Sequence, residues 1–177
     1  MIKQTIAVIA PGDMGGGVGQ ALTNAGHDVV TCLAGRSAES RSRAERCGFR
    51  DLPNLDAVVA EAALILSILP PASAIDLAGD VAAAMARTGV LPVFMDCNAI
   101  SPASSGKIAE IMTKVNAPYI DCGIIGWAPG KGPQPTRFYV SGPDLAPADA
   151  LAVEGIKLQG VGAGIGRASA LKMLYSG

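Results

Sequence analysis

A glycine-rich stretch near the start of the sequence combines small residues with the end of an apolar run. Residues 10–17 read APGDMGGG, so that Ala10, Gly12 and Gly15 occupy the pattern G-x-G-x-x-G/A with alanine in first place. Where a strand turns tightly into a helix, unpaired backbone N–H groups can bind a pyrophosphate if no bulky side chain intervenes. The stretch therefore predicts a dinucleotide site, with Gly12, Asp13, Met14 and Gly15 at the cofactor.

A second set of polar residues indicates which dinucleotide the site prefers. In NAD-binding folds an acidic residue about 20 positions beyond the glycines binds the ribose 2′-OH. This sequence has Ala34, Gly35, Arg36 and Ser37 there, with no carboxylate among them, and Arg41 follows one helical turn later. A guanidinium and a hydroxyl can bind a 2′-phosphate, and a cation at a helix start opposes the helix dipole unless an anion joins it. The segment favours NADP over NAD.

Alternating apolar runs and helical patterns supply the elements that must position these residues. Short apolar runs interleaved with helices specify a parallel sheet with right-handed crossovers, so we expect a doubly wound α/β domain of the Rossmann type. His27, the sole histidine, follows the first helix and is interpreted as a capping or packing residue. Strands are expected at residues 5–10, 28–33, 64–69, 93–96 and 119–122, and helices at 14–25, 37–47, 54–62, from Pro70 and Pro71 onward, and at 102–115.

Composition limits the classes of function. The chain has 177 residues, half of them hydrophobic, and a net charge of −1, which gives no reason to expect nucleic acid or an anionic membrane as partner. No apolar run approaches the roughly 20 residues that span a bilayer, and no signal-peptide order follows Met1, so we expect a cytoplasmic protein. Four scattered cysteines lack the spacing of a metal site. We expect buried or half-buried thiols and no metal.

Several segments together resemble the β-hydroxyacid dehydrogenase and 6-phosphogluconate dehydrogenase superfamily, which includes 3-hydroxyisobutyrate dehydrogenase. Its pattern GLGxMGxxxAxxLxxxGH is matched by Met14, Gly15, Leu22, Gly26 and His27. LSILPP, DCNAISP and GRASALKMLYSG follow in the family's order. The last of these, with DCGIIGWAPG, resembles most the branch with a C-terminal helical domain of unknown function. The resemblance implies an NADP-dependent dehydrogenase or reductase, with further cofactor contacts at Leu69, Pro70 and Asn98.

The resemblance also implies a catalytic residue. The family's lysine motif G-x-G-x-x-x-K-x-x-x-N is matched by Gly166, Ala168 and Lys172, with Ser176 in place of the asparagine. An ammonium at a substrate carbonyl oxygen can polarise it and donate a proton as hydride arrives, and the amine can take that proton back in the reverse direction. The resemblance therefore implies that Lys172 is the catalytic acid and base.

The substrate loop departs from the family. The family's D-A-P-V-S-G-G loop binds a substrate carboxylate, whereas residues 121–127 read DCGIIGW, so that Ile125 replaces the serine and is followed by Gly126 and Trp127. The threonine of the family's acid-x-S-T motif is also lost, at Ala99. An apolar wall disfavours an unpaired anion. Ile125, Gly126 and Trp127 therefore predict a bulkier or aromatic carbonyl, imine or alcohol in place of a small hydroxy acid.

The family's architecture implies a domain division. We expect residues 1–162 to form the NAD(P)-binding Rossmann domain and residues 163–177 to begin an interdomain helix. A helical second domain would complete the cleft and form a homodimer, and without it the chain would bind cofactor but have no activity. The alternative is a non-catalytic NADP-binding or sensing module.

Overall fold

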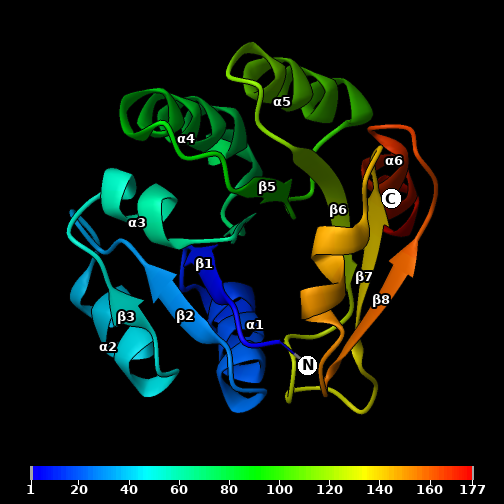
Figure 1. Cartoon of the computed structure of the whole chain (residues 1–177). Coiled ribbons are helices and arrows are strands. Elements are labelled where there is room, and N and C mark those ends of the chain that lie inside the picture. Colours follow the sequence, from blue (N-terminus) through cyan, green and yellow to red (C-terminus); the bar gives the residue numbers. More distant parts are fainter. Residues whose placement is uncertain (1, 177) are drawn as a thin grey trace.

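An eight-stranded sheet runs through the computed structural model, which describes residues 2–176 (Figure 1). The strand order is β3-β2-β1-β4-β5-β6-β7-β8. All neighbours pair in parallel except β6 and β7, which are antiparallel. This confirms the doubly wound α/β fold. The strands are β1 (Thr5–Ile9), β2 (Asp28–Thr31), β3 (Arg50–Asp51), β4 (Leu64–Ser67), β5 (Val93–Asp96), β6 (Tyr119–Ile125), β7 (Thr136–Ser141) and β8 (Ile156–Gly160).

Helices cover both faces of the sheet. One core joins the sheet to α3, α4 and α5, and a second core on the other face joins it to α1 and η2. Figure 1 shows α3, α4 and α5 along one side, with α1 and α2 on the other, and α6 over β6 and β7. The helices are α1 (Asp13–Asn24), α2 (Ala38–Arg46), α3 (Leu55–Glu61), α4 (Ala74–Thr88), α5 (Pro102–Lys114) and α6 (Arg167–Ser176), with 3-10 turns η1 (Pro71–Ser73) and η2 (Ala146–Leu151).

Capping residues mark several helix boundaries. Ser37, Asn54 and Ser101 each accept the backbone N–H three residues later, at 3.2, 2.9 and 3.1 Å. Side-chain oxygens at this position stabilise a helix start because they satisfy an otherwise unpaired donor. Gly26 follows α1 at a φ of +97°, in the left-handed region that favours glycine. The three N-caps fix where the preceding loops end, and Gly26 fixes where α1 ends.

His27 packs in the interior of the protein, which confirms its interpretation as a capping or packing residue. It is 3% exposed, its Nδ1 accepts the backbone N–H of Gln4 at 3.1 Å, and its Nε2 lies 3.1 Å from the carbonyl oxygen of Ala150. Because Nδ1 accepts, we assign the ring proton to Nε2. The imidazole thereby links β1, β2 and η2, far from the glycine-rich loop.

The sequence pattern predicts too few strands in the second half of the sheet. β6 continues to Ile125, and β7 and β8 follow it, although glycines and prolines interrupt this part of the sequence. In the other direction, the strand expected at 28–33 ends at Thr31, because the N–H of Leu33 donates to the side-chain carboxylate of Asp51 at 2.9 Å instead of to a backbone carbonyl. The helix expected from residue 163 begins at Arg167, since Gly162 and Gly166 have φ of +119° and +93°.

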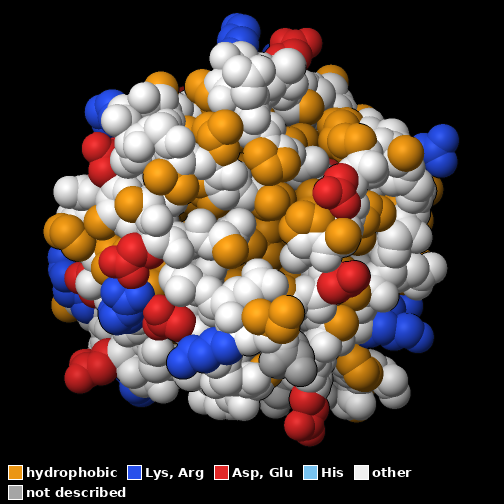
Figure 2. Space-filling model, viewed as in Figure 1, with side chains coloured by type: hydrophobic (Ala, Val, Ile, Leu, Met, Phe, Trp, Pro, Cys, Tyr) orange, Lys and Arg blue, Asp and Glu red, His pale blue; other side chains and the backbone are white. Residues whose placement is uncertain are grey.

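The surface is mixed in charge, and the four cysteines are free. On the face in Figure 2, hydrophobic side chains gather near the middle, while positive and negative side chains are interspersed around the rim. Within residues 2–176 no helix is long and apolar enough to cross a bilayer, and no group of three or more His, Cys, Asp or Glu side chains could hold a metal ion. The thiols of Cys97 and Cys122 are buried and those of Cys32 and Cys47 half-buried, all free, as predicted.

Candidate functional site

The glycine-rich loop leaves the start of α1 open. Gly12 is the N-cap residue of α1, which has no side-chain cap, in contrast to α2, α3 and α5. A Cβ atom added to Gly12 would meet nothing within 4 Å. Within residues 2–176 no side chain accepts the first-turn N–H groups of α1, and the helix dipole adds positive potential there. This is the arrangement that binds a phosphate.

Gly15 allows α1 to lie close against the end of β1. A Cβ atom at this position would stand 2.0 Å from the carbonyl oxygen of Ala10, a distance at which the backbone would have to move. Gly15 is buried. The third position of the glycine pattern therefore serves helix–strand packing, which is the role that the dinucleotide fingerprint requires of it.

Asp13 and Met14 lie on different sides of the first turn of α1. The Asp13 carboxylate forms an ion pair with Lys131, from the loop between β6 and β7. Met14 is half-buried and packs against the core beneath α1. The ion pair neutralises a carboxylate that would otherwise repel a bound phosphate, and it brings the β6–β7 loop to the start of α1.

Arg36 and Ser37 lie exposed after the end of β2. Arg36 enters none of the side-chain hydrogen bonds or ion pairs formed within residues 2–176. The Ser37 oxygen caps α2 and lies 3.2 Å from the hydroxyl of Ser40. Arg41 is more engaged, since its Nη2 donates to the carbonyl oxygen of Leu33 at 2.8 Å. Arg36 is thus the guanidinium of this segment that is available to a ligand.

Residues 34–37 contain no carboxylate, but one from another strand lies near the end of β2. Asp51, from β3, accepts the N–H of Leu33 at 2.9 Å and lies 3.8 Å from the Arg41 guanidinium. The local sequence around Arg36 gives no sign of it, because β3 is a two-residue strand that brings Asp51 alongside from 15 residues away. Its charge is opposed by the guanidinium of Arg41.

Sequence reasoning also missed Arg43. Its side chain lies against Gly16, where an added Cβ would stand 3.0 Å from the Arg43 Cδ. Its Nη1 donates to the carbonyl oxygen of Pro11 at 3.4 Å and its Nη2 to Glu39 at 3.0 Å. Arg43 therefore ties α2 to the glycine-rich loop, and helical spacing alone gives no signal for this contact.

Asn98 joins the ends of β4 and β5. Its Oδ1 accepts the N–H of Leu69 at 2.7 Å, while its Nδ2 donates to Ser67 Oγ at 2.9 Å and to Asp96 Oδ2 at 2.8 Å. Asn98 is 3% exposed. These bonds make it a positioning residue for Leu69, which is half-buried, and for the exposed Pro70 that follows. Direct contact of Leu69, Pro70 and Asn98 with a cofactor remains a prediction.

Asp96 is a buried carboxyl beneath this network. Desolvation is the main cause that raises the pKa of Asp96, to about 6, and the nearby Asp121 adds to the shift. Hydrogen bonds from Asn98 and Ser67 act in the opposite direction. The carboxyl therefore changes charge closer to neutrality than an exposed aspartate does.

Asp121 fixes the start of the helix that carries Lys172. Its Oδ2 accepts the N–H groups of Gly166 and Ser169, both at 3.0 Å, and its Oδ1 accepts the Ser169 hydroxyl at 2.5 Å. The Ser141 hydroxyl donates to the same carboxylate at 3.1 Å. A carboxylate at a helix N-terminus is stabilising. β6, β7 and α6 are therefore joined through one buried anion.

Lys172 lies one turn further along α6. An added Cβ on Gly123 would be 2.9 Å from the Lys172 Cβ and 2.8 Å from the Ala168 carbonyl oxygen. Because Asp121 contacts the start of α6 and Gly123 contacts Lys172, the helix runs in the same direction as β6. Lys172 is half-buried, and this direction carries it toward the end of β6 where Ile125 lies.

Ile125, Gly126 and Trp127 line one cavity at that end of β6. The cavity measures about 450 Å³. Ile125 is 8% exposed and Trp127 is 70% exposed, so the first forms a wall and the second a rim. The remaining lining residues are Gln134, Pro135, Arg137 and Lys157.

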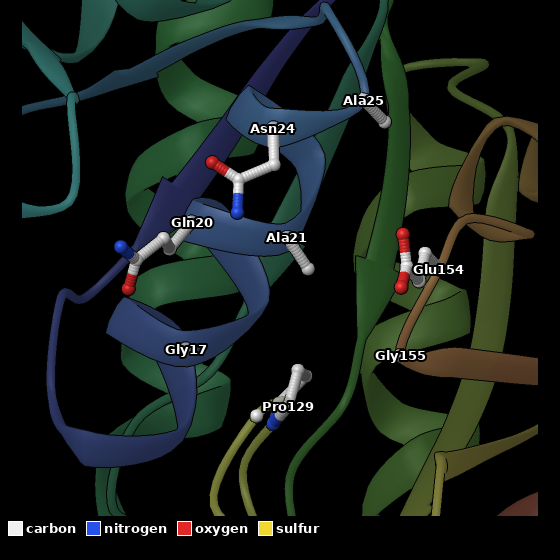
Figure 3. A pocket seen from close by; sticks show the side chains of 9 residues that line it. Gly17, Gln20, Ala21, Asn24, Ala25, Pro129, Glu154 and Gly155 are labelled. Atoms are coloured by element: carbon white, nitrogen blue, oxygen red, sulfur yellow. The ribbon is translucent and has the colours of Figure 1, made fainter.

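A separate cavity of about 460 Å³ lies along the side of α1. Figure 3 shows Gln20, Ala21 and Asn24 of α1 on one side of it, with Glu154 and Pro129 across from them. Its only charged lining residue within residues 2–176 is the acidic Glu154. A pyrophosphate is not suited to it, and the uncapped helix start remains the candidate phosphate site.

Comparisons with known proteins agree with this fold. Residues 5–153 match the family model described as the NAD binding domain of 6-phosphogluconate dehydrogenase. A relative from Methanothermus fervidus, described as an uncharacterized 28.5 kDa protein in a 7S RNA 5′ region, is 28% identical over 151 residues, which cover 84% of this chain and 55% of that protein. This chain thus spans little more than half of that relative.

Two solved structures are similar over nearly the whole chain. The first, a conserved protein of unknown function described as structurally similar to 3-hydroxyacid dehydrogenases, has a TM-score of 0.83 at 27% identity and covers 97% of this chain, which spans 63% of it. The Mycobacterium tuberculosis 3-hydroxyisobutyrate dehydrogenase has a TM-score of 0.81 at 24% identity, with coverages of 98% and 59%. The second shows a shared fold. Together with the family match over most of the chain, these findings show that the chain belongs to the family of NAD-binding domains of 6-phosphogluconate dehydrogenase.

Proposed function

We propose that this chain is the cofactor-binding domain of an NADP-dependent oxidoreductase. The observation that supports it most is the uncapped start of α1 at Gly12, which follows β1 directly and lies next to the loop that carries Arg36. In a doubly wound sheet, ligands bind outside the carboxyl ends of the strands, where the strand order reverses. Here that point lies between β1 and β4.

The hydrogen-bond donors of these residues suit the phosphate groups of a dinucleotide. The first-turn N–H groups of α1 would hold the pyrophosphate, and Arg36, with Ser37, would hold the 2′-phosphate. Both anion sites are exposed or open. Leu69 and Pro70 lie on the neighbouring strand end, at the position expected for the nicotinamide ribose side of the cofactor.

The chemistry divides between cofactor and protein. When bound, the nicotinamide supplies or accepts a hydride. Lys172 would donate a proton to the substrate oxygen or nitrogen, or accept it in the reverse direction, since an amine is suited to both. Ile125 and Trp127 would hold the substrate and exclude water. The substrate class is a carbonyl, imine, alcohol or amine.

The proposal includes a second domain beyond the Rossmann domain. Relatives are longer than this chain, which spans 55% and 63% of two of them. On α6, Met173, Leu174 and Tyr175 are 48%, 81% and 58% exposed, which is the surface expected of a helix that continues into apolar packing. We propose that α6 (Arg167–Ser176) is the start of an interdomain helix, and that a helical domain completes the cleft and forms a homodimer.

Calorimetry with NADPH and NADH tests the proposal. A charge-assisted contact to the 2′-phosphate stabilises binding by roughly 1.5 to 3 kcal/mol, so NADPH should bind about ten- to a hundredfold more tightly. Arg36→Ala should remove most of this preference. Arg46→Ala, on the last turn of α2 and bonded to Ser42, is the matched control and should retain it. Equal affinities, or an unchanged preference in Arg36→Ala, would contradict the proposal.

A further inference from the structure

Two positively charged side chains lie beside the cavity at the end of β6 without a counter-ion in the described chain. Arg137 and Lys157 are both exposed and line this cavity. Neither takes part in the ion pairs formed within residues 2–176, whereas Arg43, Arg50 and Arg87 each have an acidic partner there. The cavity therefore has two free cations at its edge.

The sheet topology brings these cations to the same edge as the cofactor loop. β7 is antiparallel to β6, and β8 is parallel to β7. The starts of β7 and β8 therefore lie where β1, β4, β5 and β6 end. Arg137 is the second residue of β7 and Lys157 the second residue of β8, so both lie at the edge where dinucleotide folds bind their ligands.

Register places them on the same face as α6. Arg137 pairs with Ile125 across the antiparallel ladder, and Lys157 pairs with Arg137 across the next. Directly paired residues point to the same side of a sheet. Ile125 packs with Ala168 and Leu171 of α6, so the row Ile125, Arg137 and Lys157 lies on the face that carries Lys172.

The arrangement is unfavourable without an anion. Like charges side by side on neighbouring strands repel each other, and within residues 2–176 neither cation forms an ion pair that would relieve the repulsion. Beside it, the side chain of Trp127 packs on the loop, where a Cβ on Gly132 would stand 2.8 Å from the Trp127 Cδ1. Thr136 Oγ1 also donates to the Trp127 carbonyl oxygen at 2.6 Å. The indole is thus held in place at the rim while remaining exposed.

We propose that Arg137 and Lys157 bind the anionic end of the substrate, a carboxylate or a phosphate, while Ile125 and Trp127 contact its apolar body. The inference rests on the proposed function and deepens it by naming the substrate class, an elongated anion with an apolar middle. It also accounts for Ile125 in place of a serine, because the negative charge is recognised on β7 and β8 and not in the β6 loop.

The sole tryptophan of the chain, Trp127, reports on this cavity directly. Its fluorescence should be titrated with three probes of matched shape: phenylacetate, phenyl phosphate and the neutral phenylacetamide. At least one anion is expected to give a saturable change in emission and to bind at least about tenfold more tightly than phenylacetamide. The better of the two anions identifies the group as carboxylate or phosphate.

A pair of double variants assigns the effect to these residues. Arg137→Gln with Lys157→Gln should reduce anion affinity to that of phenylacetamide. Lys107→Gln with Lys114→Gln, two exposed lysines on α5, changes the net charge equally and should leave anion affinity unchanged. Circular dichroism melts of both double variants check that folding is retained.

The outcomes separate this inference from the proposed function. NADPH affinity, measured by calorimetry, should be the same in wild type and in the Arg137/Lys157 variant. Phenylacetamide binding as tightly as both anions, no saturable response to either anion, or full anion binding in the Arg137/Lys157 variant would each overturn the inference. Failure of NADPH to bind, with selective anion binding intact, would instead overturn the proposed function and leave the anion site standing.

Discussion

Gly123 on β6 lies directly beneath Lys172 on α6, with room for no side chain between them. An added Cβ would be 2.9 Å from the Lys172 Cβ and 2.8 Å from the Ala168 carbonyl oxygen. The second contact is with backbone, which cannot rotate away as a side chain can. The position of Lys172 relative to the sheet therefore depends on a glycine at residue 123.

Gly123→Ala should destabilise the domain, because its methyl group must displace α6. We expect a loss of about 1–3 kcal/mol in the free energy of unfolding, as for other overpacked sites, with NADPH affinity nearly unchanged. Urea unfolding and calorimetry measure the two quantities. Gly106→Ala on α5, where an added Cβ meets nothing within 4 Å, is the control and should stabilise or be neutral. Equal stabilities of Gly123→Ala and Gly106→Ala would contradict this expectation, because they would show that α6 can shift to make room for the added methyl group without loss of stability.

Lys172→Met should remove the proton donor from the two-domain enzyme that we propose. Turnover should fall by about 10²- to 10⁴-fold, while NADPH affinity stays within about twofold, because the cofactor contacts lie on other elements. Steady-state rates and cofactor titrations measure both. Lys107→Met, exposed on α5, is the control. If the turnover of Lys172→Met stays within a few-fold of wild type, Lys172 is a solvated lysine on the helix face and has no catalytic role.

Asp51→Asn should increase the preference for NADPH. The amide oxygen can still accept the Leu33 N–H, but the negative charge that lies 3.8 Å from Arg41 is lost. Removing one charge at roughly 6 Å from a phosphate in a water-like medium changes its binding free energy by about 0.7 kcal/mol, or about threefold. Calorimetry with both cofactors checks this. A gain for NADH as large as that for NADPH would place the 2′-phosphate elsewhere.

Asp96→Asn should remove a pH dependence of stability. In the unfolded chain the carboxyl ionises near the ordinary aspartate pKa of 3.8, whereas in the folded protein its pKa is raised to about 6. The stability contributed by this group is therefore present below the lower value and lost as pH rises through the upper one. Between these values, wild type should lose about 1.4 kcal/mol per pH unit relative to Asp96→Asn. Urea unfolding of both proteins across this range measures the difference, and a constant difference would contradict the assignment.

Local signals made the first half of the sheet predictable from sequence. Ser37, Asn54 and Ser101 have side chains that satisfy the first donors of a helix, and each starts its helix where expected. The loop at Gly12 and the packing role of Gly15 also follow from residues close together in the sequence. In these places the physical cause lies within a few residues of its effect.

Other features depend on partners that are distant in the sequence. Asp51 reaches the end of β2 through pairing of a two-residue strand, and Lys131 reaches Asp13 from 118 residues away. β6 contains Asp121 and Gly123, which have low strand propensity, yet both are needed for contact with α6. The predicted substrate residues Ile125 and Trp127 could be named from a motif, but their neighbours Arg137 and Lys157 required the strand register.

The hydrogen bonds of Asp121 restrict how α6 can move relative to the sheet. They attach the first turn of α6 to two strands, so that Gly166 and Ser169 must move with the sheet as a rigid body. Any bending of this helix against the sheet has to begin after Ser169, and Lys172 lies within one turn of that pivot. Amide hydrogen exchange should accordingly be slow at Gly166 and Ser169 and become faster along the helix beyond Lys172.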